Sequence, residues 1–499
     1  MIRIADSSRM GNIDSVSQER YGIPSIVLME NAGIKAWQKL KPVLLNEKAC
    51  RLLIFTGKGN NGGDALVIAR QAFMEGFSVR VVTAAESLKG DAEINRKSVL
   101  SLGIPVSVWK ENREDHFSDA DWILDGIAGT GISGALRGTL KEMTDSVNDS
   151  GLPVCSIDVP SGIGDEYQSG YPAVRARLTL TMGLPKQCLY APASRPLCGE
   201  IINIGIGFPP DLVDDPGIPG SLWDRDDLPV LLGVTPRNTY KTKRGTLGVF
   251  CGGPGTAGAA VLSAQGAARA RAGMVFLHVP ETVYQPVAAK LASVLVYASD
   301  FSAIPEGVFS RYQALLAGPG MGTEAPVPSL IKFLISQEKP GVLDADGINV
   351  LSKLIKQGEK ISLKGRWILT PHPGEFSRLS GEPVDKILEN PLSYLRDTAR
   401  DLNAVIVLKG HVTWIMAPGG QYRIIDGMEP SLATAGSGDV LAGIIAGLLS
   451  GGMEIEDAAA AGVLIHLSAG RRAFAERGWY LSEDLLPYVS ETTAEAEGG

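Results

Sequence analysis

The 499-residue chain has few features of a secreted, membrane-spanning or nucleic-acid-binding protein. Its five cysteines are scattered, odd in number and without metal-ligand spacing, which favours free thiols in a reducing compartment. No long run of lysine and arginine occurs, and a formal net charge of −8 argues against a general nucleic-acid binder. The most apolar segment, residues 440–449, is too short to span a bilayer, and the N-terminus has no apolar signal segment. We therefore expect a cytoplasmic protein with neither a membrane nor a nucleic-acid partner. We also expect a homo-oligomer.

Glycine and proline are abundant, at 59 and 30 residues, but they are not periodic, which predicts many tight loops between short elements. In the first half, apolar runs at 52–56, 79–83, 122–124, 154–157 and 178–181 alternate with amphipathic stretches at 64–75 and 91–102. Such alternation is typical of βαβ units and a parallel sheet, in a Rossmann-like three-layer domain. A segment rich in Pro, Gly and Asp at 208–220 predicts a linker.

A second α/β series follows that linker. Its predicted strands are 247–251, 275–279, 314–317, 367–370 and 405–409, and its predicted helices are 257–272, 393–402, 438–449 and 457–475. The length of the chain is too great for one ordinary core. We therefore predict two α/β domains, at residues 1–215 and 222–492.

The segment Gly-Lys-Gly-Asn-Asn-Gly-Gly-Asp at 57–64 lies between a predicted strand and a predicted helix. Glycines there let the backbone approach a phosphate, and a helix N-terminus offers amide donors. The alternative is a tight turn in which Asp64 caps the helix. The paired asparagines favour a binding site, because a plain turn does not need their amide donors and acceptors.

Two further strand ends carry polar loops, at 124–131 with Asp125 and at 157–162 with Asp158 and Ser161. Ligands of open parallel sheets bind beyond the carboxyl ends of the strands, so the loops predict a nucleotide-sized pocket. Asp125 and Ser161 have the oxygen ligands that a hard cation prefers. Both aspartates are also common turn residues, which remains an alternative.

Together, Asn-Asn-Gly-Gly-Asp, Leu-Asp-Gly-x-x-Gly-Thr-Gly and Asp-Val-Pro-Ser-Gly resemble the NAD(P)H-hydrate epimerase family over about residues 1–215. The resemblance implies interconversion of the R and S forms of hydrated NAD(P)H, and a potassium ion held by Asn61, Asp125 and Ser161. We expect Asp158 to be the acid/base group of this reaction. The implied substrate contacts are Asn60, Asn61, Gly62, Gly63, Asp64, Gly129, Thr130, Gly131, Ile132, Ser133, Gly134, Ala135 and Asp158.

In the second half, Ala-Gly-Ser-Gly-Asp at 435–439 precedes an apolar helix. Small residues leave the amides at the helix N-terminus free to bind an anion. Asp439 can accept a proton from a hydroxyl that approaches a phosphoryl group, or it can simply cap the helix.

This segment, with Leu-Asp-Ala-Asp, Thr-Pro-His-Pro-Gly-Glu and Leu-Lys-Gly before it, resembles the ADP- or ATP-dependent NAD(P)H-hydrate dehydratase family, of ribokinase-like fold, over about 222–490. The resemblance implies phosphorylation of the S hydrate at its C6 hydroxyl, with Asp439 as base, and then loss of phosphate. Magnesium is expected with the nucleotide. The implied contacts are Lys409, Gly410, His411, Val412, Thr413 and Gly438 for the adenine nucleotide, and Ala259, Gly322, His372 and Asp439 for the hydrated dinucleotide.

Three hypotheses are compatible with these residues: a fused epimerase and dehydratase, a ribokinase-like small-molecule kinase with an accessory domain, and a nucleotide sensor without activity. Gly-Ser-Gly-Asp does not separate the first two, because both kinds of enzyme contain it. The histidine turn at 370–375 and the epimerase-like first half favour repair. The presence of both Asp158 and Asp439 argues against the sensor.

Overall fold

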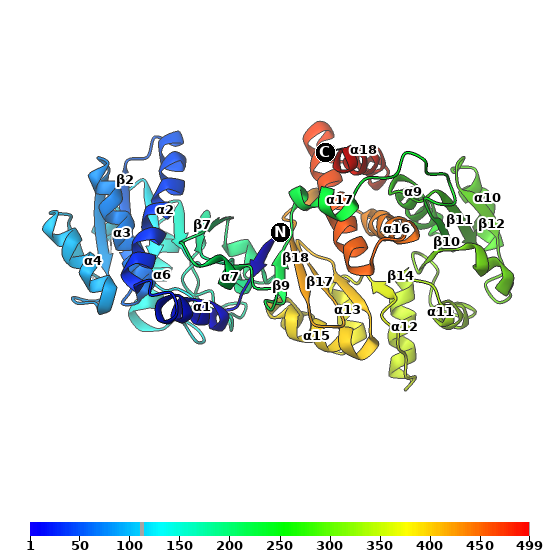
Figure 1. The fold of residues 1–499 in the computed structure, drawn as a ribbon, viewed down its shortest axis with the longest axis horizontal. Helices are drawn as coiled ribbons and strands as arrows, with labels where there is room; N and C mark the ends of the chain where they lie inside the picture. The colour runs from blue at the N-terminus through cyan, green and yellow to red at the C-terminus, as the bar shows by residue number, and fades with distance from the viewer. Residues whose placement is uncertain (110–113, 499) are drawn as a thin grey trace. The chain divides into compact units, whose positions relative to one another are not determined.

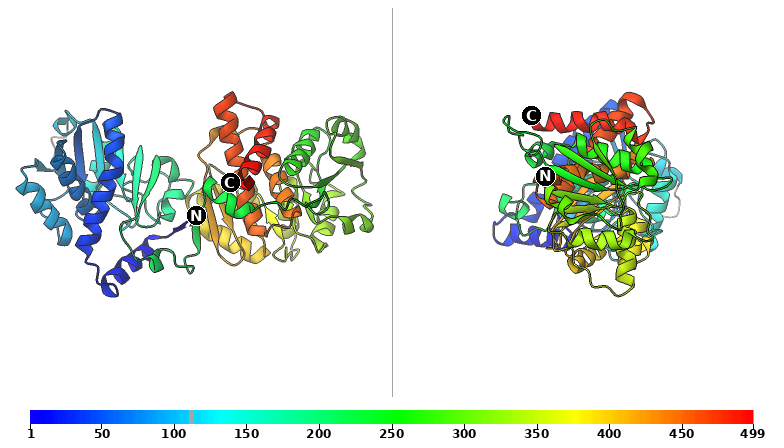
Figure 2. Two further views of the ribbon diagram at one scale, coloured as in Figure 1. Left: turned by 45° about the horizontal axis from the view of Figure 1, so that its top comes forward. Right: turned by 90° about the vertical axis from the view of Figure 1, so that its right-hand side faces the viewer.

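The computed structural model describes residues 1–109 and 114–498, and the chain divides into two compact units after Gly220 (Figure 1). None of the helices in the described part of the chain combines the length and apolarity that a bilayer crossing requires. Each unit is an α/β structure with helices on both faces of a sheet (Figures 1 and 2). The predicted fold class is confirmed.

The N-terminal unit is built on a parallel sheet with the strand order β4-β3-β2-β5-β6-β7-β8. The strands of this sheet are β2 (Arg51–Thr56), β3 (Ser78–Thr83), β4 (Val106–Val108), β5 (Trp122–Gly126), β6 (Val154–Ile157), β7 (Leu178–Met182) and β8 (Glu200–Ile204), and the short strand β1 (Ile2–Ile4) lies outside it. Its helices are α1 (Ser7–Glu19), α2 (Ser25–Asn46), α3 (Asn60–Met74), α4 (Gly90–Ser101), α5 (Glu114–Phe117), α6 (Gly138–Asp149) and α7 (Pro210–Val213).

Alternation along β2 shows why this sheet is covered on both faces. Leu52 and Ile54 pack with α2, α3 and α4, whereas Leu53 and Phe55 pack with α6. Successive side chains of a strand point to opposite faces, so a strand that is apolar at every position needs helices on both sides. A continuous apolar run therefore encodes the three-layer arrangement.

The chain reverses direction across this sheet between β2 and β5. From β2 it proceeds outward to β3 and β4, and β5 then returns to the other side of β2. The crevice beyond the carboxyl ends of two such strands is where open α/β sheets bind ligands. The predicted segment 57–64 covers the loop after β2 and the start of α3, and the predicted segment 124–131 covers the end of β5 and the loop after it.

The C-terminal unit has the strand order β9-β18-β17-β16-β15-β14-β13-β10-β11-β12. Neighbouring strands are parallel from β12 to β16, and β16, β17 and β18 are antiparallel. The strands are β9 (Gly220–Leu222), β10 (Thr246–Phe250), β11 (Met274–Val279), β12 (Leu295–Ala298), β13 (Ala314–Ala317), β14 (Gly341–Leu343), β15 (Trp367–Leu369), β16 (Val405–Leu408), β17 (Val412–Met416) and β18 (Tyr422–Asp426). The helices are α8 (Leu228–Leu232), α9 (Ala257–Arg269), α10 (Glu281–Ala288), α11 (Val327–Ser336), α12 (Asp346–Lys356), α13 (Pro373–Ser380), α14 (Val384–Glu389), α15 (Pro391–Leu402), α16 (Ser437–Ser450), α17 (Ile455–Arg477) and α18 (Leu485–Gly498). In this sheet the chain proceeds from β10 outward to β11 and β12, and β13 then returns to the other side of β10.

Helices α9 and α16 pack closely because small residues line their contact. A Cβ added at Gly443 would overlap the backbone of Ser263, and one at Gly447 would lie 2.6 Å from the carbonyl oxygen of Ala267. Such an approach excludes larger side chains. The contact fixes α16 beside α9 in the core of this unit, so the N-terminus of α16 has a defined position.

One alternative and one helix prediction need correction. Helix α3 begins at Asn60 with Gly59 as its N-cap, so Asp64 lies inside the helix and does not cap it. Helix α9 ends at Arg269, three residues before the predicted end, because Ala270 leaves the helical conformation and Arg271 has a φ of +74°. The predicted strands are present, with ends that agree to within two residues.

Candidate functional site

The loops after β2 and β5 touch at a glycine. A Cβ at Gly57 would overlap the carbonyl oxygen of Ile127, and one at Gly126 would lie 2.6 Å from the Cβ of Ala65. Only glycine permits this approach. The contact holds the two loops together at the edge of a cavity.

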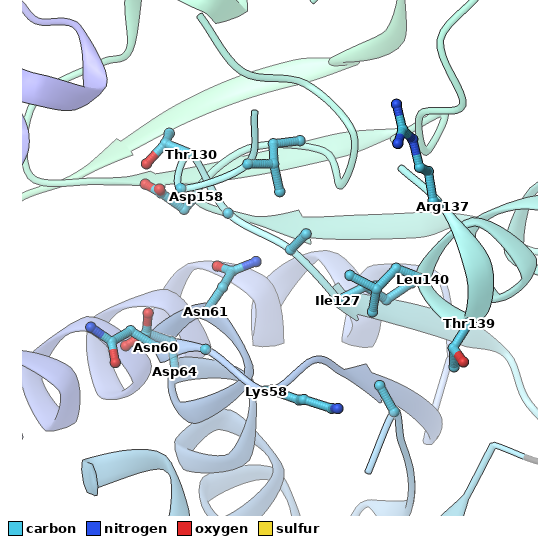
Figure 3. Close-up of a pocket in the computed structure, with 16 residues that line it drawn as sticks. Lys58, Asn60, Asn61, Asp64, Ile127, Thr130, Arg137, Thr139, Leu140 and Asp158 are labelled. Atoms are coloured by element: carbon cyan, nitrogen blue, oxygen red, sulfur yellow. The ribbon is translucent and has the colours of Figure 1, made fainter. Parts of the chain in front are cut away.

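That cavity has a volume of about 620 Å³ and lies at the switch point of the N-terminal sheet (Figure 3). Of the residues predicted to bind the hydrated dinucleotide, it is lined by Asn60, Asn61, Asp64, Gly129, Thr130, Gly131, Ile132 and Asp158. Its other lining residues are Lys58, Gly59, Ala84, Ile127, Ala128, Arg137, Thr139 and Leu140. Three loops far apart in sequence therefore meet in one nucleotide-sized space.

Five predicted contacts lie outside this lining. Gly62 and Gly63 serve packing, since a Cβ on Gly62 would lie 2.5 Å from Gly57 O and one on Gly63 would lie 2.6 Å from Met29. The hydroxyl of Ser133 donates to Glu166 at 2.8 Å. Gly134 and Ala135 belong to the same loop and also do not line the cavity.

Asp158 has a strained backbone and an anchored carboxylate. Its φ is +65°, a left-handed conformation that costs a non-glycine residue about 1–3 kcal/mol. Its Oδ1 accepts hydrogen bonds from Lys186 Nζ and from the Met182 amide, the latter at 3.2 Å. Lys186 is only 2% exposed and also donates to the Met182 carbonyl oxygen. The surroundings thus hold this carboxylate in one position.

A second carboxyl group, Asp64, lies near Asp158 in the same cavity (Figure 3). Burial, and then the negative charge of Asp158, raise the pKa of Asp64 well above its usual value. A smaller chamber of about 250 Å³, lined among others by Asp14 and Lys186, shares Asp64 and Asp158 with the large cavity. The site therefore combines an anchored carboxylate with a carboxyl group that favours its protonated form.

Of the residues predicted to hold potassium, Asn61 lies in the first turn of α3, Asp125 at the end of β5 and Ser161 in the loop after β6. Asp125 is fully buried and accepts from Ser161 through Oγ at 2.5 Å and through the amide at 2.9 Å. Burial raises the pKa of Asp125. Asn61 is 8% exposed, faces Gly129, and has no hydrogen-bond partner for Oδ1 or Nδ2 in the part of the chain described. The unpartnered side-chain amide of Asn61 and the neighbouring oxygen atoms of Asp125 and Ser161 are suitable ligands for a hard cation.

In the C-terminal unit, the ends of β13 and β14 meet at Gly318, whose added Cβ would overlap the carbonyl oxygen of Asp344. The next residue, Ala345, has a φ of +48°. This turn separates Asp344, at the end of β14, from Asp346, the first residue of α12. The backbone is strained at a strand end here too, directly between two carboxylates.

Asp344 anchors Lys409, which was predicted to bind the nucleotide. The carboxylate of Asp344 accepts from Lys409 Nζ at 2.7 Å and from Thr370 Oγ1 at 2.8 Å. A Cβ added to Gly438 would lie 3.4 Å from Lys409 Nζ. The ammonium group therefore lies beside the first turn of α16. Burial opposes its charge, but Asp344 and Glu375 outweigh that effect and raise the pKa of Lys409.

Asp439 lies in the first turn of α16, after the N-cap Gly436, so it is not the capping residue. Burial, and next the negative charge of Asp344, raise the pKa of Asp439 to about 7, against the opposing charge of Lys409. A carboxylate with this pKa can take up and release a proton near neutral pH, as a general base requires.

The other predicted contacts of the hydrated dinucleotide lie on neighbouring loops. Gly322 lines a separate cavity of about 510 Å³, and its amide donates to Asp346 at 2.8 Å. A Cβ added at Gly320 would lie 3.2 Å from the Cβ of Ala259, so the first turn of α9 lies against the loop after β13. His372 is the N-cap of α13, where its Nδ1 accepts from the Gly374 amide at 3.0 Å. His372 thus has a structural role whatever else it contacts.

The rest of the predicted nucleotide segment forms the turn and start of a hairpin. Gly410 and His411 are exposed between β16 and β17, whereas Val412 and Thr413 are 1% and 9% exposed in β17. Burial of these two side chains leaves mainly backbone groups for contact with a nucleotide.

Several residues of these sites were not singled out from the sequence. They are Lys58, Arg137 and Thr139 in the large cavity, Lys186 at Asp158, and Asp344 and Thr370 at Lys409. Asp344 and Thr370 belong to motifs noted above, so position after a strand was a usable signal for them. No local pattern distinguishes Arg137 from the other arginines of the chain.

Comparison with known proteins identifies relatives that cover nearly the whole chain. A family model described as NAD(P)H-hydrate dehydratase matches residues 247–491, and one described as YjeF-related protein N-terminus matches 25–188. The chain is 34% identical to the bifunctional NAD(P)H-hydrate repair enzyme Nnr of Moorella thermoacetica, over 97% of this chain and 96% of that protein. It is 32% identical to the protein of the same name from Coxiella burnetii, over 94% of this chain and 95% of that protein.

Solved structures resemble the C-terminal unit. An ADP/ATP-dependent NAD(P)H-hydrate dehydratase from Bacillus subtilis, co-crystallised with ATP and Mg²⁺, is 26% identical with a TM-score of 0.50, over 55% of this chain and 98% of that one. A ribokinase-like superfamily protein from Enterococcus faecalis, 23% identical with a TM-score of 0.51 over 56% of this chain and 97% of that one, shares the fold.

Proposed function

The chain belongs to the family of bifunctional NAD(P)H-hydrate repair enzymes, and we propose that residues 1–215 carry the epimerase and residues 222–492 the dehydratase. Its reaction is the repair of hydrated NAD(P)H. The R and S hydrates are interconverted, and the S form is dehydrated with an adenine nucleotide as co-substrate. The assignments of individual residues below are our proposal.

In the epimerase, Asp158 exchanges protons with the hydrate. Its carboxylate takes the proton of the C6 hydroxyl while the C6–N1 bond opens to leave a C6 carbonyl group. Asp64, in its protonated form, supplies a proton to the departing nitrogen. Ring closure on the other face of the carbonyl returns both protons and inverts C6. Asn60, Asn61 and the loop from Gly129 to Ile132 surround the ring, as their place in the cavity supports.

A potassium ion fits beside this site. Asn61, Asp125 and Ser161 would hold it, and the orphaned Oδ1 of Asn61 supports that assignment. The ion would supply a fixed positive charge at the edge of the substrate cavity. Asp125 and Ser161, already hydrogen-bonded to each other, keep the loops after β5 and β6 together.

In the dehydratase, Asp439 removes the proton of the C6 hydroxyl as the oxygen attacks the terminal phosphoryl group of ADP or ATP. Lys409 and the amides of the first turn of α16 stabilise the charge on the phosphoryl oxygens. Magnesium bound with the nucleotide would supply the positive charge that neutralises its phosphates. Loss of phosphate from C6 and of a proton from C5 then restores the ring double bond.

The remaining residues hold the two substrates. Residues 409–413 and Gly438 bind the adenine nucleotide, and Ala259, Gly322, His372 and Asp439 bind the hydrated dinucleotide. The observation that best supports this site is the Lys409 ammonium group, which bonds to Asp344 and lies beside Gly438 at the N-terminus of α16.

The substitution Asp439→Asn tests the proposal. Purified protein is incubated with chemically hydrated NADH, magnesium and either ADP or ATP, and NADH absorbance is followed. We expect NADH recovery to disappear while adenine-nucleotide binding persists and the R and S hydrates still interconvert, because the epimerase lies in the other unit. Wild-type rates in the variant would contradict the role of Asp439. Phosphate transfer without NADH recovery in the wild type would instead indicate a small-molecule kinase.

A further inference from the structure

The large cavity of the N-terminal unit has cations at the end opposite its carboxyl groups. Figure 3 shows Asp64 and Asp158 at one end, with Arg137 and Thr139 toward the other and the Lys58 ammonium group directed to that side. All five side chains line the same cavity. The cavity is therefore polarised, from acidic at the reacting end to basic at the far end.

The two cations are available to a ligand. Within residues 1–109 and 114–498, neither the Lys58 nor the Arg137 side chain forms a hydrogen bond or an ion pair. Arg137 is the N-cap residue of α6, which has twelve residues and no side-chain cap. Thr139 and Leu140, in the first turn of α6, also line the cavity, so free backbone amides accompany the arginine.

An independent observation indicates that this cavity is suited to a polar ligand. Asn61 is more than nine-tenths buried, lines the cavity, and has an unpartnered Nδ2 as well as an unpartnered Oδ1 among the described residues. A potassium ion can satisfy only the oxygen, because Nδ2 is a donor. The Nδ2 donor therefore needs an acceptor supplied by the ligand.

We propose that Lys58, Arg137 and the first turn of α6 form a phosphate-binding subsite, which holds phosphate groups of the hydrated dinucleotide while its nicotinamide ring lies at Asp64 and Asp158. This inference rests on the proposed epimerase function. Arginine binds phosphate through paired N–H donors, and a helix N-terminus favours negative charge. The reduced ring is uncharged whereas the phosphates are anionic, so the polarity of the cavity selects one of the two orientations of the substrate.

Such a subsite contributes binding that is equal in the ground state and the transition state, so its loss raises KM with little change in kcat. A hydrogen bond between charged groups changes affinity by about tenfold or more. We expect Arg137→Gln to raise KM for epimerisation by about tenfold and Arg137→Lys to raise it less. Lys58→Gln is a second variant of the same subsite and should act in the same direction.

The experiment measures epimerisation of hydrated NADH, hydrated NADPH and hydrated reduced nicotinamide riboside, which lacks phosphate. In the wild type we expect a much higher KM for the riboside, and in Arg137→Gln we expect that difference to shrink. An equal rise in KM for NADH and NADPH hydrates assigns the subsite to the diphosphate, and a larger rise for NADPH hydrate assigns it to the 2′-phosphate. Arg175→Gln, at an exposed arginine outside the cavity lining, is the matched control and should leave KM unchanged.

The inference is overturned if both variants keep wild-type KM values for the two dinucleotide hydrates, or if the wild type treats the riboside like the dinucleotides. If the wild-type protein does not epimerise any hydrate, the proposed function itself fails instead. A retained kcat in the variants shows that the reacting end of the cavity is intact, so loss of folding cannot imitate the expected result.

Discussion

The pKa of Asp439 allows a pH-profile test with two substitutions that should act in opposite directions. Its pKa is raised to about 7 by burial and by Asp344, and Lys409 opposes the increase. Because the proposed base must be ionised, dehydration of the S hydrate should increase with pH, with a midpoint near 7. At pH 6 only about one tenth of the molecules then have an ionised Asp439.

Asp344→Asn removes a negative charge and so should lower the pKa of Asp439. A charge within about 4–6 Å changes a carboxyl pKa by about 1–3 pH units. At the lower limit the midpoint falls to about 6, and the ionised fraction at pH 6 increases about fivefold. Because asparagine keeps an acceptor for the hydroxyl of Thr370, we expect the turn after β14 to keep its conformation in this variant.

Lys409→Met removes the opposing positive charge and should move the midpoint in the other direction, to about 8 or above. The ionised fraction at pH 7 then falls from about one half to about one tenth. Loss of the lysine also weakens nucleotide binding, so the rates are measured at saturating ADP or ATP.

The assay follows NADH recovery from purified S hydrate between pH 5 and 9, so that the epimerase is not needed. Interconversion of R and S hydrates by the same preparations is the internal control and should keep one pH profile throughout. Midpoints that stay in place, or that move in the same direction in both variants, would refute the electrostatic account of Asp439.

Two further predictions concern the N-terminal unit. Lys186→Met leaves the carboxylate of Asp158 without its ion-pair partner, so it should lower the kcat of epimerisation at least tenfold. Lys186→Arg should recover part of this loss. An unchanged kcat and an unchanged pH profile would exclude a positioning role for Lys186. Replacing potassium by a large organic cation should slow epimerisation by the wild type but not by Asn61→Ala, because this variant has already lost one ligand of the potassium ion. If the replacement slowed both proteins equally, that result would argue against the proposed ion site.

The fold could be predicted well where the apolar pattern was continuous. Strands β2, β5, β6 and β10 are buried along nearly their whole length, and a run of apolar residues between turn signals is enough to identify such strands. Strand β12 was missed because most of its residues are exposed, so it has no buried face to mark it. Short strands such as β4 and β9, with three residues each, give too brief a pattern.

Site residues could be predicted where they belong to a motif that follows a strand, as for Asp158, Lys409 and Asp439. The rest depends on tertiary structure. Lys186 and Asp158 are 28 positions apart and meet only because β6 and β7 are neighbours in the sheet. Arg137 enters the cavity because α6 begins there, and nothing in its flanking residues requires that.

The two units share the same backbone arrangement at their candidate sites. In each, a glycine after a strand brings the loops of two neighbouring strands together, Gly57 those after β2 and β5 and Gly318 those after β13 and β14. In each, a non-glycine residue in a left-handed conformation also follows a strand, Asp158 after β6 and Ala345 after β14. A left-handed glycine would remove the strain at little steric cost, yet at Asp158 it would also remove the carboxylate. Strain of this kind persists where the surrounding structure and the function require that particular side chain. The ion pair of Asp158 with Lys186 offsets part of the cost, since it stabilises the same turn that the left-handed residue destabilises. At position 158, stability alone would therefore favour glycine, whereas the proposed chemistry requires aspartate. The strained backbone indicates that the carboxylate is kept in spite of its cost in stability.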